Sequence, residues 1–133
     1  MPSTFELLVV ALGGAGGSLI RYFLALVSVR LPGGSTLAGT FVANLAGCFA
    51  IGLLYAVATN HPQWLSPTAI TGLRVGLLGG LTTFSTFAAE AVLLGNGGQS
   101  GLMVLYLAAS VGFGVLAVSA GIWAGSSNQG APS

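Results

Sequence analysis

Near the middle of the chain stands the stretch Gly79-Gly80-Leu81-Thr82-Thr83-Phe84-Ser85-Thr86-Phe87. Two adjacent glycines precede a cluster of hydroxyl-bearing side chains, all inside a long apolar segment. A continuous helix that faces lipid has no need of such a cluster, and unwound backbone survives at membrane depth only where protein, water or an ion surrounds it. The stretch therefore predicts a transmembrane helix that unwinds at Gly79-Gly80 and resumes near Thr83.

Such a break offers ligands to ions of both signs. Backbone carbonyls released from a helix are natural cation ligands, and the amides that begin the second half-helix favour an anion. On that half-helix Phe84 and Phe87 lie on one side, and Thr83, Thr86, Phe87 and Glu90 follow one another at helical spacing. The two phenylalanine rings could accompany this polar track, or they could simply pack against lipid or the protein core. For Glu90 the alternatives are a carboxylate that reaches the membrane interface and a role at a pore mouth.

The composition places this stretch in a membrane protein. The chain has 133 residues, 54% hydrophobic and only 4% charged, with a mean hydropathy of +0.94. Soluble domains carry roughly 25% charged residues, and disordered segments are polar, so both classes are excluded. Three basic residues cannot follow a phosphate backbone, which excludes nucleic acid as a partner. One Cys, one His and two carboxylates cannot assemble a catalytic site, so we expect no enzyme.

Breakers divide the chain into four segments long enough to cross a hydrocarbon core of about 30 Å. We expect spans at about residues 5–29, 35–59, 67–94 and 101–125, in a single all-α transmembrane domain of residues 1–133. The segments are continuous and rich in Gly, Ala and Leu, so a β-barrel is excluded.

The basic residues give no preferred orientation. Arg30 follows the first span and Arg74 begins the third, so each side of the membrane receives one. A chain without a charge bias can insert both ways, which suggests dual topology and an antiparallel dimer. Glycine-rich rows in the first span and at Ala117, Gly121 and Gly125 could serve such an association or pack within the chain.

Other polar side chains inside the spans are candidate functional groups. Asn44 has Thr40 one turn before it and Cys48 one turn after, and its amide could donate to an anion or bond to another helix. On the fourth span Tyr106 and Ser110 share a face, and Ser110 could instead bond back to its own helix. For Arg21 the alternatives are a cation at a pore mouth and a side chain that snorkels to the interface.

Three motifs together closely resemble the Fluc/CrcB family of fluoride channels. They are GGAGGSLIRY from Gly13 to Tyr22, GTFVANLAG from Gly39 to Gly47, and GGLTTFSTF from Gly79 to Phe87. The resemblance implies an antiparallel dual-topology homodimer in the cell inner (plasma) membrane, with two pores through which fluoride leaves the cell passively and a structural sodium ion at the centre. Fluoride, sodium, membrane lipid and a second copy of the chain are the partners it implies.

The resemblance also assigns residues. Its fluoride pore comprises Asn44, Phe84 and Phe87, the hydroxyl track of Thr83, Ser85 and Thr86, and the fourth-span positions Tyr106 and Ser110. Its vestibule comprises Arg21 and Glu90. The backbone carbonyls of Gly79 and Thr82 correspond to its sodium ligands.

Two rival functions remain. A small dual-topology exporter coupled to protons would share this length and charge balance, but it needs a carboxylate deep in the membrane, and neither Glu6 nor Glu90 lies at the middle of a span. A purely structural glycine-rich protein would need neither Asn44 nor the hydroxyl cluster. We also expect Gly79 and Gly80 to resist substitution more than any glycine pair of the first span.

Overall fold

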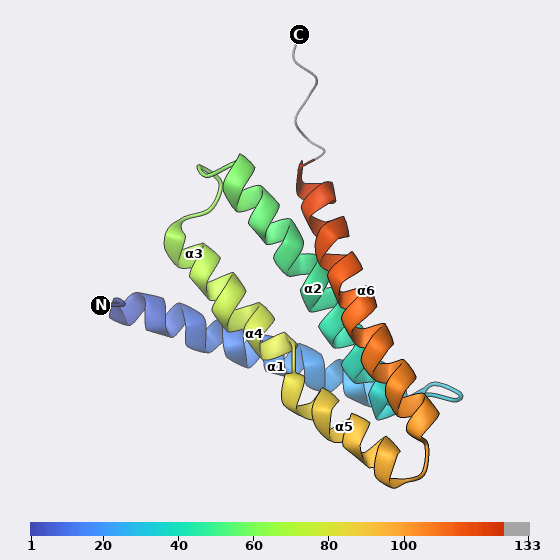
Figure 1. Cartoon of the computed structure of the whole chain (residues 1–133). Coiled ribbons are helices and arrows are strands. Elements are labelled where there is room, and N and C mark those ends of the chain that lie inside the picture. The colour runs from blue at the N-terminus through green and yellow to red at the C-terminus, as the bar shows by residue number, and fades with distance from the viewer. Residues whose placement is uncertain (127–133) are drawn as a thin grey trace.

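The chain is all-helical in the computed structural model, which describes residues 1–126 (Figure 1). Its elements in chain order are α1 (Thr4–Arg30), α2 (Thr36–Asn60), α3 (Pro67–Thr71), η1 (Gly72–Leu78), α4 (Gly79–Leu81), α5 (Phe84–Asn96) and α6 (Ser100–Ser126). The expected domain of residues 1–133 ends in residues 127–133, which lie outside the described part.

Four helical stretches are long and apolar enough to cross a membrane: Thr4–Arg30, Thr36–Asn60, Pro67–Asn96 and Ser100–Ser126. Their ends agree with the expected spans to within two residues. The third stretch joins α3, η1, α4 and α5, and it is bent. The prediction of an all-helical chain with four long apolar helices, the third of them broken, is therefore confirmed.

Hydroxyl side chains cap the start of most of these helices. Ser3, Ser35 and Ser66 each accept a hydrogen bond from the backbone N–H three residues ahead, and Pro67 follows Ser66 at the first helical position. Such caps satisfy N–H groups that the helix itself leaves without partners. The turns between spans use Gly33 and Gly98, whose φ values of 72° and 74° are left-handed.

The third span breaks later than the sequence predicted. Gly79 is helical, with φ −63° and ψ −36°, and it begins α4 together with Gly80 and Leu81. The extended residues are Thr82 (φ −85°, ψ 154°) and Thr83 (φ −149°, ψ 120°). The predicted break is thus present, but its assignment to Gly79-Gly80 is wrong, because two threonines rather than two glycines carry the extended backbone.

The glycines of the third span serve close packing instead. A Cβ atom at Gly80 would lie 2.5 Å from the Gly14 carbonyl oxygen, and one at Gly13 would lie 2.8 Å from that of Gly72. Only backbones without side chains can approach so closely. At Gly79, by contrast, the nearest atom would be 3.8 Å away, which is ordinary contact. This packing therefore does not support the expectation that both Gly79 and Gly80 resist substitution more than any glycine pair of the first span, because Gly79 has room for a Cβ atom and Gly13 has not.

The remaining helices complete a loose bundle. Figure 1 shows α2 and α6 side by side, and α1 contacts η1 and α4 of the third span. Gly121 packs on the Phe49 carbonyl and Gly125 on Ala56 of α2, so the small residues of α6 pack within the chain. Large apolar side chains such as Leu12 and Trp123 are exposed by 73% and 74%, as suits a surface that faces lipid or a second subunit.

A short π-helix, η1 from Gly72 to Leu78, precedes the break and was not predicted. Its wider turn is rare and is frequently found at functional sites. Nothing in the periodicity of an evenly apolar segment distinguishes such a turn from an α-helix.

Candidate functional site

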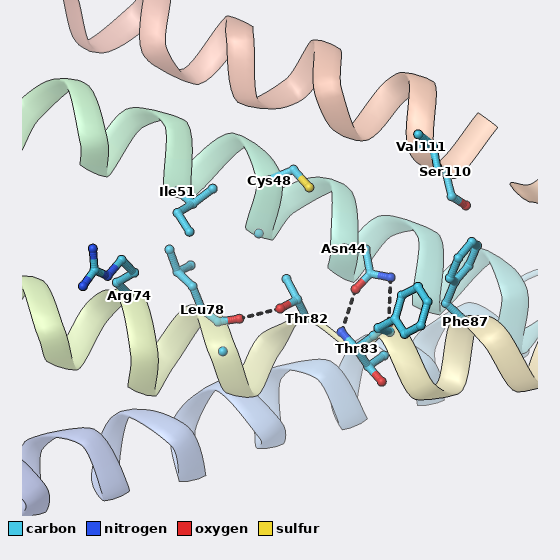
Figure 2. Close-up of a pocket in the computed structure, with 13 residues that line it drawn as sticks. Asn44, Cys48, Ile51, Arg74, Leu78, Thr82, Thr83, Phe87, Ser110 and Val111 are labelled. Atoms are coloured by element: carbon cyan, nitrogen blue, oxygen red, sulfur yellow. Dashed lines mark hydrogen bonds between the residues drawn. The ribbon is translucent and has the colours of Figure 1, made fainter. Parts of the chain in front are cut away.

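Asn44 of α2 holds the broken backbone of the third span (Figure 2). Its Nδ2 donates to the Thr83 carbonyl oxygen at 3.0 Å, and the Thr83 N–H donates to Oδ1 at 2.8 Å. Of the two alternatives for Asn44, the bond to another helix is present. An amide nitrogen carries two hydrogens, and among the described residues only one of them has a partner, so Asn44 keeps a donor for a ligand.

At the same break, two backbone N–H groups donate to other acceptors than the carbonyls they would reach in a continuous helix. In a continuous helix the Thr83 N–H would donate to Gly79 and the Thr86 N–H to Thr82. Here the Thr83 N–H donates to Asn44, and the Thr86 N–H donates to the Thr83 hydroxyl at 3.2 Å. The carbonyls of Gly79 and Thr82 are thereby released from the helical pattern.

These two carbonyls suit a sodium ion by their chemistry. Neutral backbone oxygens are hard ligands, and sodium prefers oxygen donors. Gly79 and Thr82 are both among the residues that line one groove of the protein. One chain supplies two such oxygens, and a second copy would be needed for a fuller coordination shell.

Arg21 of α1 lies against the break from the other side. Its Nε donates to the Gly80 carbonyl oxygen at 3.1 Å, a group whose helical donor would have been the Phe84 N–H. The side chain also lines a pocket of about 260 Å³, the side pocket, together with Ser18, Thr40, Thr83 and Thr86. Arg21 is therefore turned toward the protein rather than only toward the membrane interface.

Three hydroxyl groups gather at the start of α5. The Thr83 hydroxyl donates to Thr86 Oγ1 at 3.1 Å and lies 3.3 Å from Ser85 Oγ. The cluster predicted from the sequence is thus assembled around Thr83, which caps α5. Thr86 lines the side pocket, whereas Ser85 lines neither that pocket nor the groove described next.

A larger groove of about 450 Å³, the main groove, runs between α2, η1, α5 and α6. Figure 2 shows Arg74 at one end of it and Phe87 and Ser110 at the other, with Thr82 and Asn44 between them. Phe84 lines the same groove. Most of the predicted pore residues therefore share one cavity.

The rings of Phe84 and Phe87, which line the main groove, form a row with the ring of Tyr106. The ring centroids of Phe84 and Phe87 are 5.9 Å apart, and those of Phe87 and Tyr106 are 5.2 Å apart. Phe87 is 8% exposed and Phe84 79% exposed in the single chain. Phe87 is therefore a packed ring that lines the groove, whereas Phe84 is free to contact a ligand, lipid or a second subunit.

Glu90 is buried behind this row. Thr40 donates to its Oε1 at 3.0 Å and the Tyr106 hydroxyl donates to its Oε2 at 2.8 Å. All three residues are less than a tenth exposed, so the alternative in which Glu90 reaches the membrane interface is wrong. Periodicity could not reveal this because the partners come from α2 and α6.

Ser110 of α6 has a buried hydroxyl oxygen without a hydrogen-bond partner among the described residues. The alternative in which it bonds back to its own helix is therefore not realised. A buried hydroxyl normally has a hydrogen-bond partner. Ser110 lines the main groove, so a polar ligand or a water molecule there could provide that partner.

Among the lining residues that the sequence did not assign to a site are an arginine and a cysteine. Arg74 and Cys48 both line the main groove, from η1 and α2 respectively. Arg74 was considered only for its effect on orientation. An arginine inside a membrane span was the available signal.

Comparison with known proteins identifies the family. The family described as CrcB-like protein, Camphor Resistance (CrcB), matches residues 8–122. A protein of Allorhizobium ampelinum named fluoride-specific ion channel FluC is 42% identical over 90% of this chain and 95% of its own length. Proteins of the same name from Cereibacter sphaeroides and Acidobacterium capsulatum are each 41% identical, over 88% and 87% of this chain and 91% and 92% of their own lengths. Together with four helices long and apolar enough to cross a membrane, these matches show that the chain belongs to the CrcB family, whose members are ion channels rather than enzymes.

Proposed function

We propose that this chain forms a passive channel selective for fluoride, which lets the ion leave the cell down its electrochemical gradient. The main groove is the observation that best supports this proposal. Its lining combines the free amide hydrogen of Asn44 and the unpartnered Ser110 hydroxyl with the rings of Phe84 and Phe87. The choice of fluoride as the transported ion is supported by the relatives, which are named fluoride-specific ion channels.

The chemistry of these groups suits fluoride. Fluoride is small and strongly hydrated, so a pore must replace its water with hydrogen-bond donors. Amide and hydroxyl donors do so without the strength of a full charge, and several weak sites in series allow the ion to move on. Ring edges carry positive quadrupole density and can face an anion. Larger halides would fit between such rings poorly.

Asn44 has a double role in this proposal. Its two bonds to Thr83 keep the backbone extended, and its second Nδ2 hydrogen faces a ligand. In this proposal the hydroxyls of Thr83, Ser85 and Thr86 at the start of α5 and of Ser110 on α6 form the polar track, and Arg21 is the vestibule cation. Tyr106 and Glu90 have a structural role instead, because the Tyr106 hydroxyl is already donated to the buried Glu90 carboxylate.

The functional unit in this proposal is an antiparallel dual-topology homodimer in the inner membrane. Balanced arginines, the exposure of Phe84 and the apolar outer faces of the helices support it. C-terminal tags should be labelled from both sides of intact cells in comparable amounts. Labelling from one side alone would refute the antiparallel arrangement.

A sodium ion at the break would be held by the carbonyls of Gly79 and Thr82 from both subunits. It would neutralise carbonyl dipoles and stabilise the assembly without taking part in conduction. Ligands that bind only the folded state raise its stability, so the melting temperature of the purified dimer should fall when sodium is replaced by choline. An unchanged melting temperature over a wide range of sodium concentrations would contradict this.

The experiment that tests the function uses proteoliposomes and a fluoride electrode. Addition of a potassium ionophore should release fluoride from vesicles loaded with potassium fluoride, whereas vesicles loaded with potassium chloride should retain chloride. A vesicle population that retains fluoride would overturn the proposal.

The buried carboxylate of Glu90 favours a second candidate, a proton-coupled exporter. Against it, both Glu90 oxygens already accept hydrogen bonds from Thr40 and Tyr106, as suits a structural carboxylate. A pH gradient imposed without a fluoride gradient distinguishes the two functions. The channel predicts no uphill fluoride movement, and the exporter predicts accumulation.

A further inference from the structure

Arg74 is a cation inside a membrane span without a counter-charge in the part of the chain that the structure describes. It lies in η1, seven residues after the start of the third span, and is exposed. Among residues 1–126, it forms neither a hydrogen bond nor an ion pair. Charged side chains within membrane spans are costly and mark ion pathways or paired sites.

Neither of the two side-chain carboxylates, those of Glu90 and Glu6, forms an ion pair with Arg74. Glu90 is held by Thr40 and Tyr106 at the opposite end of the third span, and Glu6 lies in the first turn of α1. Neither is a partner of Arg74. An anion that complements Arg74 would therefore come from outside residues 1–126 of this chain.

The position of Arg74 connects the membrane surface to the candidate pore. With a rise of 1.5 Å per residue, it lies about 10 Å along the span from Pro67, within reach of the interface for a side chain of this length. It also lines the main groove, whose other end holds Phe87 and Ser110 (Figure 2). One cavity thus joins a surface-accessible cation to the hydrogen-bond donors.

We propose that Arg74 captures fluoride at the outer end of the main groove and raises its local concentration there, so that it determines the rate at which the ion reaches Asn44. This inference rests on the proposed function, and it assigns a second arginine to the pathway besides Arg21. A cleft that carries charge of one sign between low-dielectric walls focuses the electric field, and such clefts raise association rates tenfold or more.

A mobile anion fits the groove better than a lipid phosphate does. Beyond Arg74 the groove continues to the free hydrogen of Asn44 and the Ser110 hydroxyl, donors that an ion moving inward would meet in turn. A phosphate fixed on Arg74 would leave these groups without a partner. The mobile ion is therefore the occupant that we assign.

The test compares Arg74→Gln and Arg74→Lys with Arg30→Gln, which removes the same charge at the end of α1, away from the groove. Each purified dimer is reconstituted in neutral-lipid vesicles, and the initial fluoride efflux is measured from low to saturating fluoride. Ionic strength is set with an impermeant salt at about 0.01 M and about 1 M, where charges act over about 30 Å and 3 Å.

At low fluoride and low ionic strength, Arg74→Gln should reduce the initial rate about tenfold, the lower end of the steering effect. The difference from the parent should close at saturating fluoride and at about 1 M salt. Arg74→Lys should retain most of the parent rate, and Arg30→Gln should equal the parent.

Three results would overturn the inference while the proposed function stands: parent rates in Arg74→Gln, a loss that is the same at every fluoride and salt concentration, or a loss confined to vesicles that contain an anionic phospholipid. The last would assign Arg74 to a lipid phosphate. A parent protein that releases no fluoride would instead contradict the proposed function itself.

Discussion

Asn44 forms two hydrogen bonds with the backbone of one residue, Thr83, at 3.0 Å and 2.8 Å. The pair substitutes for the helical bonds that the third span gives up there. It thereby couples a side chain of α2 to the shape of a break between α4 and α5. This relation explains why one amide can both maintain the break and present a donor at it.

Replacement of Asn44 by alanine should reduce both stability and fluoride flux. The Thr83 N–H would lose its acceptor in a partly buried place, which costs about 1–3 kcal/mol. Asn60→Ala is the matched control, because Asn60 lies on the same helix and its only described bond is a weak one of 3.5 Å to Ser126. Thermal unfolding of the purified protein and liposome flux are the measurements. Equal behaviour of the two variants would contradict the role of Asn44.

Phe84→Ile and Phe87→Ile should separate flux from folding. Both should lower fluoride flux sharply, because both remove an aromatic ring that lines the main groove, and only an aromatic ring offers an anion a positive edge. Phe87 is buried and Phe84 is exposed, so only Phe87→Ile should lower stability as well, by about 1–3 kcal/mol. Phe23→Ile, an exposed ring on α1, serves as the control. Parent-like flux in both variants would show that the rings only pack.

The hydroxyl groups of Thr40 and Tyr106, which donate to Glu90, should each contribute to stability in a way that depends on the Glu90 carboxylate. Tyr106→Phe and Thr40→Val each leave one oxygen of a buried carboxylate without a donor, at a cost of about 1–3 kcal/mol. Each loss should shrink when Glu90→Gln is already present, because the carboxylate is then gone. A double-mutant cycle measured by thermal or denaturant unfolding gives the coupling. Strict additivity would mean that these hydrogen bonds contribute nothing.

Gly80→Ala and Gly79→Ala should differ despite their adjacency. A methyl group at Gly80 would meet the Gly14 carbonyl at 2.5 Å, whereas at Gly79 the nearest atom would be at 3.8 Å. We expect Gly80→Ala to destabilise the protein by about 1–3 kcal/mol, the usual cost of overpacking, and Gly79→Ala to fold like the parent. Dimer recovery and melting temperature measure this. A Gly79→Ala variant as unstable as Gly80→Ala would contradict the packing described for α4.

The four spans could be predicted from the sequence because length and hydropathy alone decide them. The break could be predicted too, but not its position, because Gly79-Gly80 and Thr82-Thr83 are both plausible breakers. What decides between them is the approach of Gly80 to Gly14 and the reach of Asn44 to Thr83, contacts between segments far apart in the chain. The buried position of Glu90 and the π-helix η1 depend on tertiary packing in the same way.

The central claim, passive conduction of fluoride, is tested most directly by the reversal potential in planar bilayers that contain the purified protein. With a tenfold fluoride gradient at equal pH and equal chloride, the account predicts a current that reverses at the fluoride equilibrium potential, about 59 mV in magnitude. A tenfold chloride gradient should leave the reversal potential near zero. A reversal potential that follows chloride or pH, or the absence of any fluoride current, would contradict the account.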